Sequence, residues 1–198
     1  MRKTLVIFWV LSLFALIAWL FWHNEWKYSL PTPVPQSYHP AQPGDKVTLK
    51  EKLQTDNKPL FLHFFNPACP CSRFNIPHVK SLTKKYGNRM TFAIVVMSRD
   101  KNYTVEEIQD KFGLTVPVLS DNSIAQSCGV YSTPQAVIID ADSKLYYRGN
   151  YNKSRYCTDK NSNYAQMAID SLLQKTQHPV FSQYALKAYG CELPGCTK

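Results

Sequence analysis

The sequence predicts an α/β fold, a central mixed sheet with helices on both faces, placed behind an N-terminal transmembrane helix. Two observations lead to this expectation. An uncharged apolar run stands near the N-terminus, and strand-like and helix-like segments alternate from residue 46 onward. Alternation of this kind is typical of a sheet covered by helices. A length of 198 residues leaves room for an anchor and one domain of ordinary size.

The apolar run covers residues 4–22, "TLVIFWVLSLFALIAWLFW", and contains no charge. A helix of this length rises roughly 28 Å, close to the thickness of one hydrocarbon core. The run ends in bulky residues rather than the small residues of a cleavage site, so we expect a retained anchor rather than a cleaved signal peptide. Arg2 and Lys3 precede it, which favours a cytoplasmic N-terminus. The sequence therefore predicts a single-pass protein of the cytoplasmic (inner) membrane whose soluble domain faces the periplasm or the cell exterior.

Composition divides the chain into four regions. The predicted regions are a membrane anchor with its flank (1–29), a Pro-rich linker (30–44), a folded domain (45–178) and a Cys-containing C-terminal tail (179–198). Five prolines fall between residues 31 and 43, which is typical of an extended, semi-rigid spacer that would lift the domain off the membrane.

Hydrophobic patterns and local stop signals place the elements of the domain. Continuous apolar runs of strand length predict buried strands, and a Thr-x-x-Glu capping box at 104–107 predicts the start of a helix. The predicted strands are residues 46–49, 59–65, 90–97, 136–140 and 144–149, the last two forming a hairpin. The predicted helices are residues 50–57, 72–86, 104–112 and 163–175.

The net charge of +9 does not point to a nucleic-acid partner. Basic residues are scattered along the chain, without the run or stripe that follows a phosphate backbone. We therefore expect a solvated basic surface.

Two cysteines separated by one residue, Cys69 and Cys71, stand between a predicted strand and a predicted helix in "FFNPACPCSRFNIP", residues 64–77. Cys69 would lie at the helix N-terminus, where unpaired N–H groups and the helix dipole stabilise a thiolate. A lower pKa makes Cys69 the expected attacking sulfur. Cys71 would point away from Cys69, because positions two apart on a helix differ by about 200°. A Cys69–Cys71 disulfide would therefore be strained and easily reduced.

The other four cysteines leave several pairings open. Cys69 could form the strained couple with Cys71, or be resolved by Cys157 or Cys191. Cys191 and Cys196 flank a Pro-Gly turn, so a structural disulfide between them could tether the tail. Cys128 is expected to be a small buried hydrophobe.

Two segments carry a resemblance to the thioredoxin-like superfamily, and in particular to its membrane-anchored TlpA/ResA-type (redoxin) group. "FFNPACPCSRFNIP" resembles the strand, Cys-x-x-Cys and helix junction of that group. "FGLTVPVLSDNSIAQSCGVYSTPQAVIIDADSKLYYRG", residues 112–149, resembles its second half, with Thr133-Pro134 in the cis-proline position. The resemblance covers residues 45–176 and does not extend to the tail.

The resemblance also marks departures from the family pattern. The first family cysteine falls on Cys69, but the second falls on Ser72, which gives an atypical Cys-Pro-Cys-Ser motif. The helix proline falls on Pro77. Asn75 occupies the place where relatives often carry a glutamate that helps proton transfer.

The resemblance implies a thiol–disulfide oxidoreductase that acts on exported cysteine-containing proteins, together with a redox partner protein. Cys69 would form a mixed disulfide and Cys71 would resolve it, without a cofactor. Thr133 and Pro134 would position an extended substrate segment by backbone pairing, and Tyr131 would line the same groove.

Three alternatives stay open at this stage. A Sco-like copper(I) chaperone would use Cys69, Cys71 and a histidine, His78, because two thiolates and an imidazole are soft ligands. A thiol peroxidase would use Cys69, although Asn66 stands where peroxiredoxins carry threonine. A non-catalytic binding module would explain serine at position 72.

Overall fold

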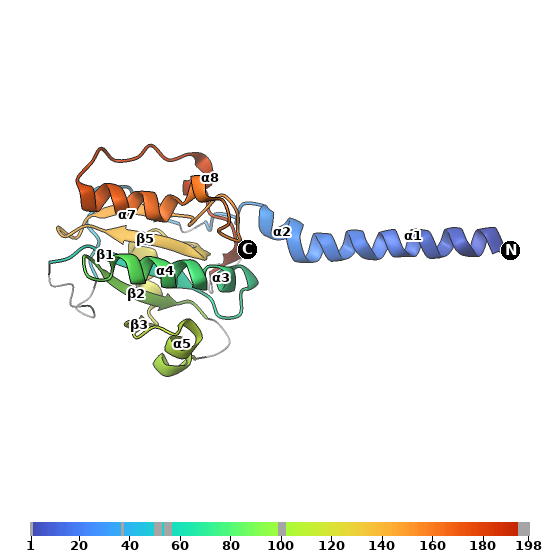
Figure 1. The fold of residues 1–198 in the computed structure, drawn as a ribbon, viewed down its shortest axis with the longest axis horizontal. Coiled ribbons are helices and arrows are strands. Elements are labelled where there is room, and N and C mark those ends of the chain that lie inside the picture. The colour runs from blue at the N-terminus through green and yellow to red at the C-terminus, as the bar shows by residue number, and fades with distance from the viewer. Residues whose placement is uncertain (1, 37, 50–52, 54–56, 99–101, 194–198) are drawn as a thin grey trace.

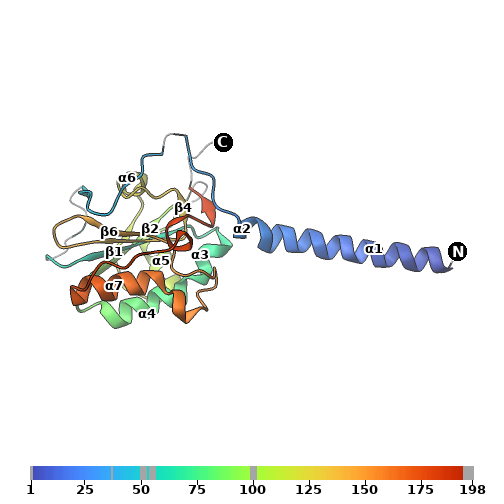
Figure 2. The same ribbon diagram turned by 90° about the horizontal axis from the view of Figure 1, so that it is seen from above.

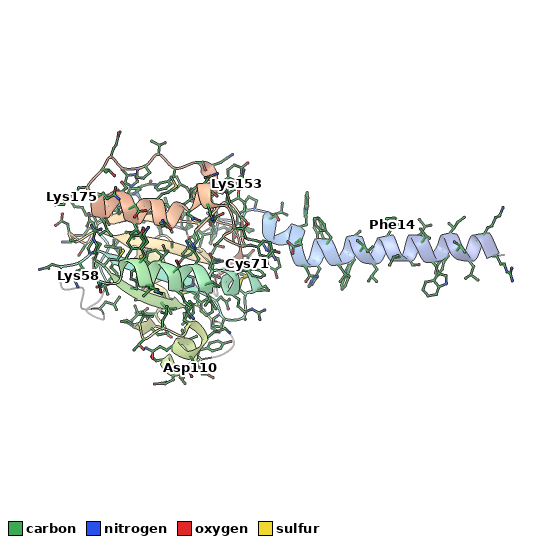
Figure 3. All side chains as sticks on the ribbon, in the orientation of Figure 1. Phe14, Lys58, Cys71, Asp110, Lys153 and Lys175 are labelled. Atoms are coloured by element: carbon green, nitrogen blue, oxygen red, sulfur yellow. A yellow bond between two sulfur atoms is a disulfide. The ribbon has the colours of Figure 1, made fainter. Side chains whose placement is uncertain are left out.

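The computed structural model describes residues 2–36, 38–49, 53, 57–98 and 102–193. A long helix, α1 (Arg2–Phe21), continues through η1 (Trp22–Trp26) into α2 (Lys27–Ser29) and projects from the domain (Figure 1). Its apolar side chains, such as Phe14, extend into open space without packing on the domain (Figure 3). Over Arg2–Trp26 the mean hydropathy reaches 2.5, so this helix is long and apolar enough to cross a membrane. Its orientation across a membrane stays a prediction.

A five-stranded mixed sheet forms the centre of the domain, with strand order β3-β2-β1-β5-β6. The strands are β1 (Leu60–Phe65), β2 (Thr91–Val96), β3 (Val118–Leu119), β5 (Gln135–Ile139) and β6 (Leu145–Gly149). β1 pairs in parallel with β2 and antiparallel with β5, while β2–β3 is parallel and β5–β6 is antiparallel. The predicted fold class is confirmed.

Helices cover both faces of this sheet, which explains the continuous apolar run of β1 (Figure 2). Phe61 and Phe65 pack with α4 (Ile76–Tyr86), α5 (Val105–Phe112) and α7 (Tyr164–Gln174). Leu62 and Phe64 point to the other face, where α6 (Asn122–Ser127) and the segment around Val47 complete a second core. Burying each of these β1 side chains contributes roughly 1.5–3 kcal/mol.

Most of the predicted elements are confirmed, with boundaries shifted by one or two residues. Four of the five predicted strands and the predicted helices over residues 72–86, 104–112 and 163–175 are present. The capping box at the start of α5 forms, with Thr104 Oγ1 accepting from the Glu107 N–H and the Glu107 carboxylate accepting from the Thr104 N–H. Gly113 ends α5 at φ 58°, a left-handed conformation that glycine adopts easily.

Two local predictions need correction. The helix predicted over 72–86 is divided at Asn75 into α3 (Pro70–Phe74) and α4, because Pro77 has no N–H with which to continue the hydrogen-bond ladder. The strand predicted at 46–49 is absent, and Lys46 forms only an isolated bridge with Lys144. The helix predicted at 50–57 falls largely outside the described residues.

The Pro-rich segment packs along the domain instead of holding it at a distance, which corrects the predicted spacer. Pro31 forms a bridge with Tyr189, and the Tyr38 hydroxyl donates to the Gly129 carbonyl at 3.0 Å. Val47, just beyond the segment, is buried in the core. Proline fixes an extended backbone, but the polar and aromatic residues between the prolines supply contacts that bind the segment to the domain.

Short elements of the C-terminal region complete the fold. The 3-10 turn η2 (Lys160–Ser162) precedes α7, and α8 (Gln183–Leu186) follows it. The two-residue strand β7 (Cys191–Glu192) pairs with β4 (Ser132–Thr133) in a separate small sheet. The described end of the predicted tail, residues 188–193, therefore lies against the domain.

Candidate active site

The candidate site begins where β1 ends. The Asn66 side-chain oxygen accepts from the Ala68 N–H at 2.9 Å, and the Cys69 N–H donates to the Asn66 carbonyl at 3.0 Å. The Asn66 N–H donates to the Ser72 hydroxyl at 3.2 Å. Ser72 is fully buried, so the residue in the place of the second family cysteine fixes the loop that presents Cys69.

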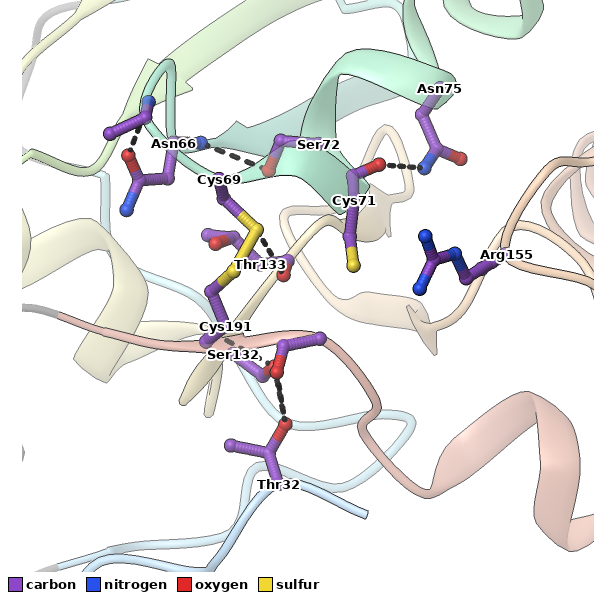
Figure 4. The surroundings of a disulfide bond; sticks show 12 residues. Thr32, Asn66, Cys69, Cys71, Ser72, Asn75, Ser132, Thr133, Arg155 and Cys191 are labelled. Carbon is purple, nitrogen blue, oxygen red and sulfur yellow. Dashed lines mark hydrogen bonds between the residues drawn. A yellow bond between two sulfur atoms is a disulfide. The ribbon is translucent and has the colours of Figure 1, made fainter. Parts of the chain in front are cut away.

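Cys69 forms a disulfide with Cys191 of the tail, with their Cα atoms 6.3 Å apart (Figure 4). This pairing was one of the open alternatives, whereas a Cys69–Cys71 couple is not what the structure contains. Cys191 is consequently not bonded to Cys196, a residue that lies outside the described part of the chain. Cys191 belongs to β7 rather than to α3, so its sulfur can reach Cys69 without unwinding the first turn of α3.

Thr133 and Pro134 meet the tail beside this disulfide. Their peptide bond is cis, as predicted. Thr133 is the antiparallel partner of Cys191, and its carbonyl oxygen lies 3.9 Å from Cys69 Sγ. Because Cys69 is in a disulfide and carries no proton, this approach is a contact rather than a donated hydrogen bond.

Ser132 and Thr32 hold the tail from two sides, and sequence reasoning identified neither. The Ser132 hydroxyl donates to the Cys191 carbonyl at 3.1 Å. Thr32 donates its N–H to the Ala188 carbonyl at 2.9 Å and its hydroxyl to the Gly190 carbonyl at 3.4 Å. The tail thus lies between the Pro-rich segment and β4. No local sequence signal marks these contacts, since they join residues 59 to 158 positions apart.

A cleft of about 370 Å³ opens next to the disulfide. Cys71, one of its lining residues, lies at the end of the domain nearest the N-terminal helix (Figure 3). Residues of five separate stretches of the chain line it, among them Glu25, Tyr28, Cys71, Pro134, Cys157 and Gly190. Tyr131, predicted to line the groove, is buried with its ring 4.8 Å from that of Tyr38. Its part in substrate binding stays a prediction.

Asn75 connects the two remaining cysteines of the cleft. Its side-chain amide donates to the Cys71 carbonyl at 3.2 Å, and its oxygen accepts from the Cys157 thiol at 2.9 Å. Burial raises the pKa of Cys157 to about 12, so this thiol stays protonated near neutral pH and is a weak nucleophile. Cys128, the expected buried hydrophobe, is fully buried, and burial raises its pKa to about 12.

His63, two residues before the end of β1, is buried and neutral. Burial, with a smaller contribution from His78, lowers the pKa of His63 to about 3. Its Nδ1 lies 2.6 Å from the Tyr151 hydroxyl, which is also buried. Burial lowers the pKa of His78 as well. The two histidines therefore carry no positive charge toward the disulfide at neutral pH.

No group of three or more His, Cys, Asp and Glu side chains that could hold a metal ion occurs among the described residues. The copper(I) alternative with Cys69, Cys71 and His78 as ligands stays a prediction. It would require Cys69 to be released from Cys191 first.

Comparison with known families and proteins gives two kinds of match. The family described as "Domain of unknown function (DUF6436)" matches residues 39–193. Two proteins named thiol-disulfide oxidoreductase ResA are also similar. The one from Halalkalibacterium halodurans is 24% identical over 104 residues, covering 52% of this chain and 57% of the relative. The one from Geobacillus thermodenitrificans is 29% identical over 101 residues, covering 48% and 58%. The chain thus spans less than two thirds of the length of either relative.

Solved structures support the fold. A hypothetical protein from Sinorhizobium meliloti superposes with a TM-score of 0.63 at 17% identity, covering 79% of this chain and 96% of the other. The solution structure of a proposed thioredoxin from Neisseria meningitidis gives a TM-score of 0.52 at 16% identity, covering 71% and 95%. At these identities the likeness concerns the fold alone, and it agrees with a thioredoxin-like domain.

Proposed function

The chain belongs to the family described as a domain of unknown function (DUF6436), and from its site we propose that it is a thiol–disulfide oxidoreductase with Cys69 and Cys191 as its redox couple. The observation that supports this most strongly is the position of the Cys69–Cys191 disulfide. It lies at the end of the central strand β1 and beside Thr133-Pro134, where the thioredoxin-like group carries its reactive cysteine. The two relatives named ResA carry the same activity in their names.

The proposed reaction is an exchange of disulfides in two steps. A substrate thiolate attacks Cys69 Sγ, the Cys69–Cys191 bond breaks, and Cys191 leaves as a thiolate that takes up a proton. The second substrate thiolate then attacks the substrate sulfur of the mixed disulfide and releases Cys69. The substrate dithiol is oxidised to a disulfide, and two electrons and two protons end on Cys69 and Cys191. The reverse sequence reduces a substrate disulfide.

Substrate, partner and location follow as parts of the same proposal. The substrates are exported cysteine-containing proteins, and a redox partner protein restores the couple after each turnover. The N-terminal helix holds the domain at the cytoplasmic membrane, on the periplasmic or outer side. Sulfur carries the electrons, so the exchange requires no cofactor. Cys71, which lines the neighbouring cleft, is the second candidate for the resolving thiol.

The test uses the full-length protein in detergent and measures reduction of insulin disulfides with dithiothreitol as the terminal reductant. We expect Cys69→Ser to lose at least ten-fold in rate, because no other sulfur occupies its position. Cys128→Ala is the matched control: this cysteine is equally buried but lies in the second core, and its variant should keep the wild-type rate. A Cys69→Ser variant that retains the wild-type rate would overturn the proposal.

A further inference from the structure

The C-terminal segment 188–193 lies in a slot with hydrogen-bonding partners on both edges. On one edge β7 pairs with β4 in the register Ser132↔Glu192 and Thr133↔Cys191. On the other edge Thr32 bonds to the carbonyls of Ala188 and Gly190. An extended segment in this position is bound through its backbone, as a strand added to a sheet edge. Figure 4 shows Thr32 and Ser132 on the Cys191 side of the disulfide, away from Cys69.

Gly190 is the residue of this segment with the least room. A Cβ atom there would lie 2.2 Å from the Thr133 carbonyl oxygen and 3.3 Å from Pro134 Cδ. Its φ of +133° is also a conformation that other residues rarely adopt. Thr133 is fully buried and paired in β4, so its carbonyl group cannot easily move away from an added side chain. The position immediately before the bonded cysteine therefore accepts only glycine.

The neighbouring positions show how the rest of the segment is held. Ala188 is fully buried, and Leu193 joins the second core at 7% exposure. Tyr189 lines the cleft, and Glu192 is half-buried. The slot therefore holds a small residue, an aromatic residue, glycine, cysteine, a polar residue and an apolar residue, in that order.

We infer that segment 188–193 is an internal occupant of the substrate groove, and that the groove selects extended protein segments with glycine immediately before the reactive cysteine. The inference rests on the proposed function, since the occupant is bonded to the proposed nucleophile. The structure then corresponds to a mixed disulfide in which the chain's own tail takes the substrate's place. An incoming thiolate attacks Cys69, Cys191 departs with the electron pair of the broken bond, and the external segment replaces the tail.

The tethered tail competes with an external segment for the groove. A short tether gives the tail an effective concentration on the order of millimolar, so a substrate must match the groove in order to displace it. Glycine before cysteine is the feature of that match that the groove enforces by steric exclusion. A segment with a side chain at this position would have to displace β4, at the cost of its backbone pairing.

The direct test presents peptides to one and the same protein, so folding of variants cannot confuse the result. Full-length Cys191→Ala/Cys196→Ala protein in detergent is reduced and mixed with peptides whose cysteine carries a thionitrobenzoate group. Attack by Cys69 releases the coloured thiolate. The peptides are AYGCEL, the tail's own sequence, AYACEL, and AYGCQL as a control with the glycine kept. Rates are divided by those with dithiothreitol alone, and the rate with an additional Cys69→Ser substitution is subtracted.

We expect AYGCEL to react at least ten-fold faster than AYACEL, and AYGCQL to react within two-fold of AYGCEL. Equal Cys69-dependent rates for AYGCEL and AYACEL would overturn the glycine requirement while leaving the oxidoreductase proposal intact. Rates that do not exceed the Cys69→Ser background for any peptide would overturn the proposed function itself, and the inference with it.

A second test measures how well the tail fits the groove, with two matched glycine variants. Gly190 and Gly44 both have positive φ, but a Cβ at Gly44 meets nothing within 4 Å. Full-length Gly190→Ala and Gly44→Ala proteins are equilibrated in glutathione buffers, and the Cys69–Cys191 disulfide is quantified by mass spectrometry after alkylation. We expect Gly190→Ala to lower its formation constant at least ten-fold and Gly44→Ala to change it less than two-fold. A wild-type constant for Gly190→Ala would contradict the inference.

Discussion

Thr32 of the Pro-rich segment and Ser132 of β4 share a buried hydrogen bond, their hydroxyl oxygens 2.8 Å apart across 100 residues of sequence. Thr32 belongs to the segment that follows the N-terminal helix, and Ser132 lies two residues before Pro134. Both residues also bond to the tail segment that carries Cys191: Thr32 donates to its Ala188 and Gly190 carbonyls, and Ser132 donates to the Cys191 carbonyl. The Pro-rich segment, the tail and β4 therefore meet in one small network, so a change in the bonding of Cys191 alters contacts of all three.

Removing the Thr32 hydroxyl should loosen the tail. Thr32→Val keeps the size of the side chain but loses its hydrogen bonds to Ser132 and Gly190. A loss of about 1 kcal/mol corresponds to roughly a five-fold lower formation constant of the Cys69–Cys191 disulfide. Glutathione titration with alkylation and mass spectrometry measures this constant. Thr48→Val, at an exposed threonine, serves as the control and should leave it unchanged. An unchanged constant in Thr32→Val would show that the backbone contacts alone hold the tail.

Replacing the two candidate resolving cysteines separately should distinguish their roles. If Cys191 resolves the mixed disulfide at Cys69, Cys191→Ala should accumulate covalent complexes with exported proteins, whereas Cys71→Ala should not. Non-reducing gels of membranes from cells that express each full-length variant, followed by mass spectrometry of the shifted bands, provide the measurement. The complexes should disappear in Cys69→Ser/Cys191→Ala. Accumulation in Cys71→Ala instead would assign resolution to Cys71.

The buried neutral His63 should make the protein less stable in mild acid. Its folded-state pKa of about 3 lies below the ordinary value near 6.5, so the unfolded chain binds the extra proton first as the pH falls. The stability that it contributes is complete above about pH 6.5 and is lost progressively down to about pH 3. Between pH 7 and pH 5 this single histidine lowers the free energy of unfolding by about 2 kcal/mol, and the lowered pKa of His78 acts in the same direction.

Urea unfolding of the full-length protein in detergent at pH 7, 6 and 5 measures this effect. His63→Gln should have a smaller slope of unfolding free energy against pH than the wild type, even if it is less stable overall. The slope rather than the absolute stability is the diagnostic quantity. Parallel slopes for the two proteins would mean that the pKa of His63 is the same in the folded and the unfolded protein, which would contradict this prediction.

Asn75 should stabilise the cleft by joining Cys71 and Cys157. Asn75→Ala removes both of its side-chain hydrogen bonds and leaves a buried carbonyl and a thiol without these partners. We expect a loss of about 1–3 kcal/mol in unfolding free energy and faster alkylation of Cys157 by iodoacetamide. Asn102→Ala, at an exposed position, is the matched control. An alkylation rate of Cys157 equal to that of the wild type would contradict the role assigned to Asn75.

Local sequence signals were sufficient where the governing interaction is local. The capping box at Thr104, the stop at Gly113 and the apolar run of β1 each depend on a few neighbouring residues and on burial that the pattern itself reveals. The division of the helix at Asn75 could have been anticipated from Pro77 by the same reasoning. The absent strand at 46–49 is a different case, because four residues of strand-like composition need a partner edge, and only one bridge to Lys144 forms.

The pairing of the cysteines could not be deduced from sequence. The short spacing of Cys191 and Cys196, five residues apart, favoured a disulfide between them. The two bonded cysteines, Cys69 and Cys191, are instead separated by 122 residues. Sequence spacing measures the cost of closing a loop in an unfolded chain, and that cost grows only slowly with length. Folding brings β4 and β7 together through other contacts, so the local concentration of the two sulfurs depends on packing rather than on spacing.

The sequence by itself determined the apolar N-terminal helix, the mixed sheet and the position of Cys69 at the end of β1, since each follows from hydrophobic period or a motif of contiguous residues. The cis Thr133-Pro134 bond followed from the resemblance to the thioredoxin-like group. Only the tertiary structure decided that the tail returns to this site, that Cys191 bonds to Cys69, and that Thr32, Ser132 and Gly190 shape the slot around it. The physical reason is that these contacts join distant segments through backbone pairing and steric fit, which leave no periodic trace in the sequence.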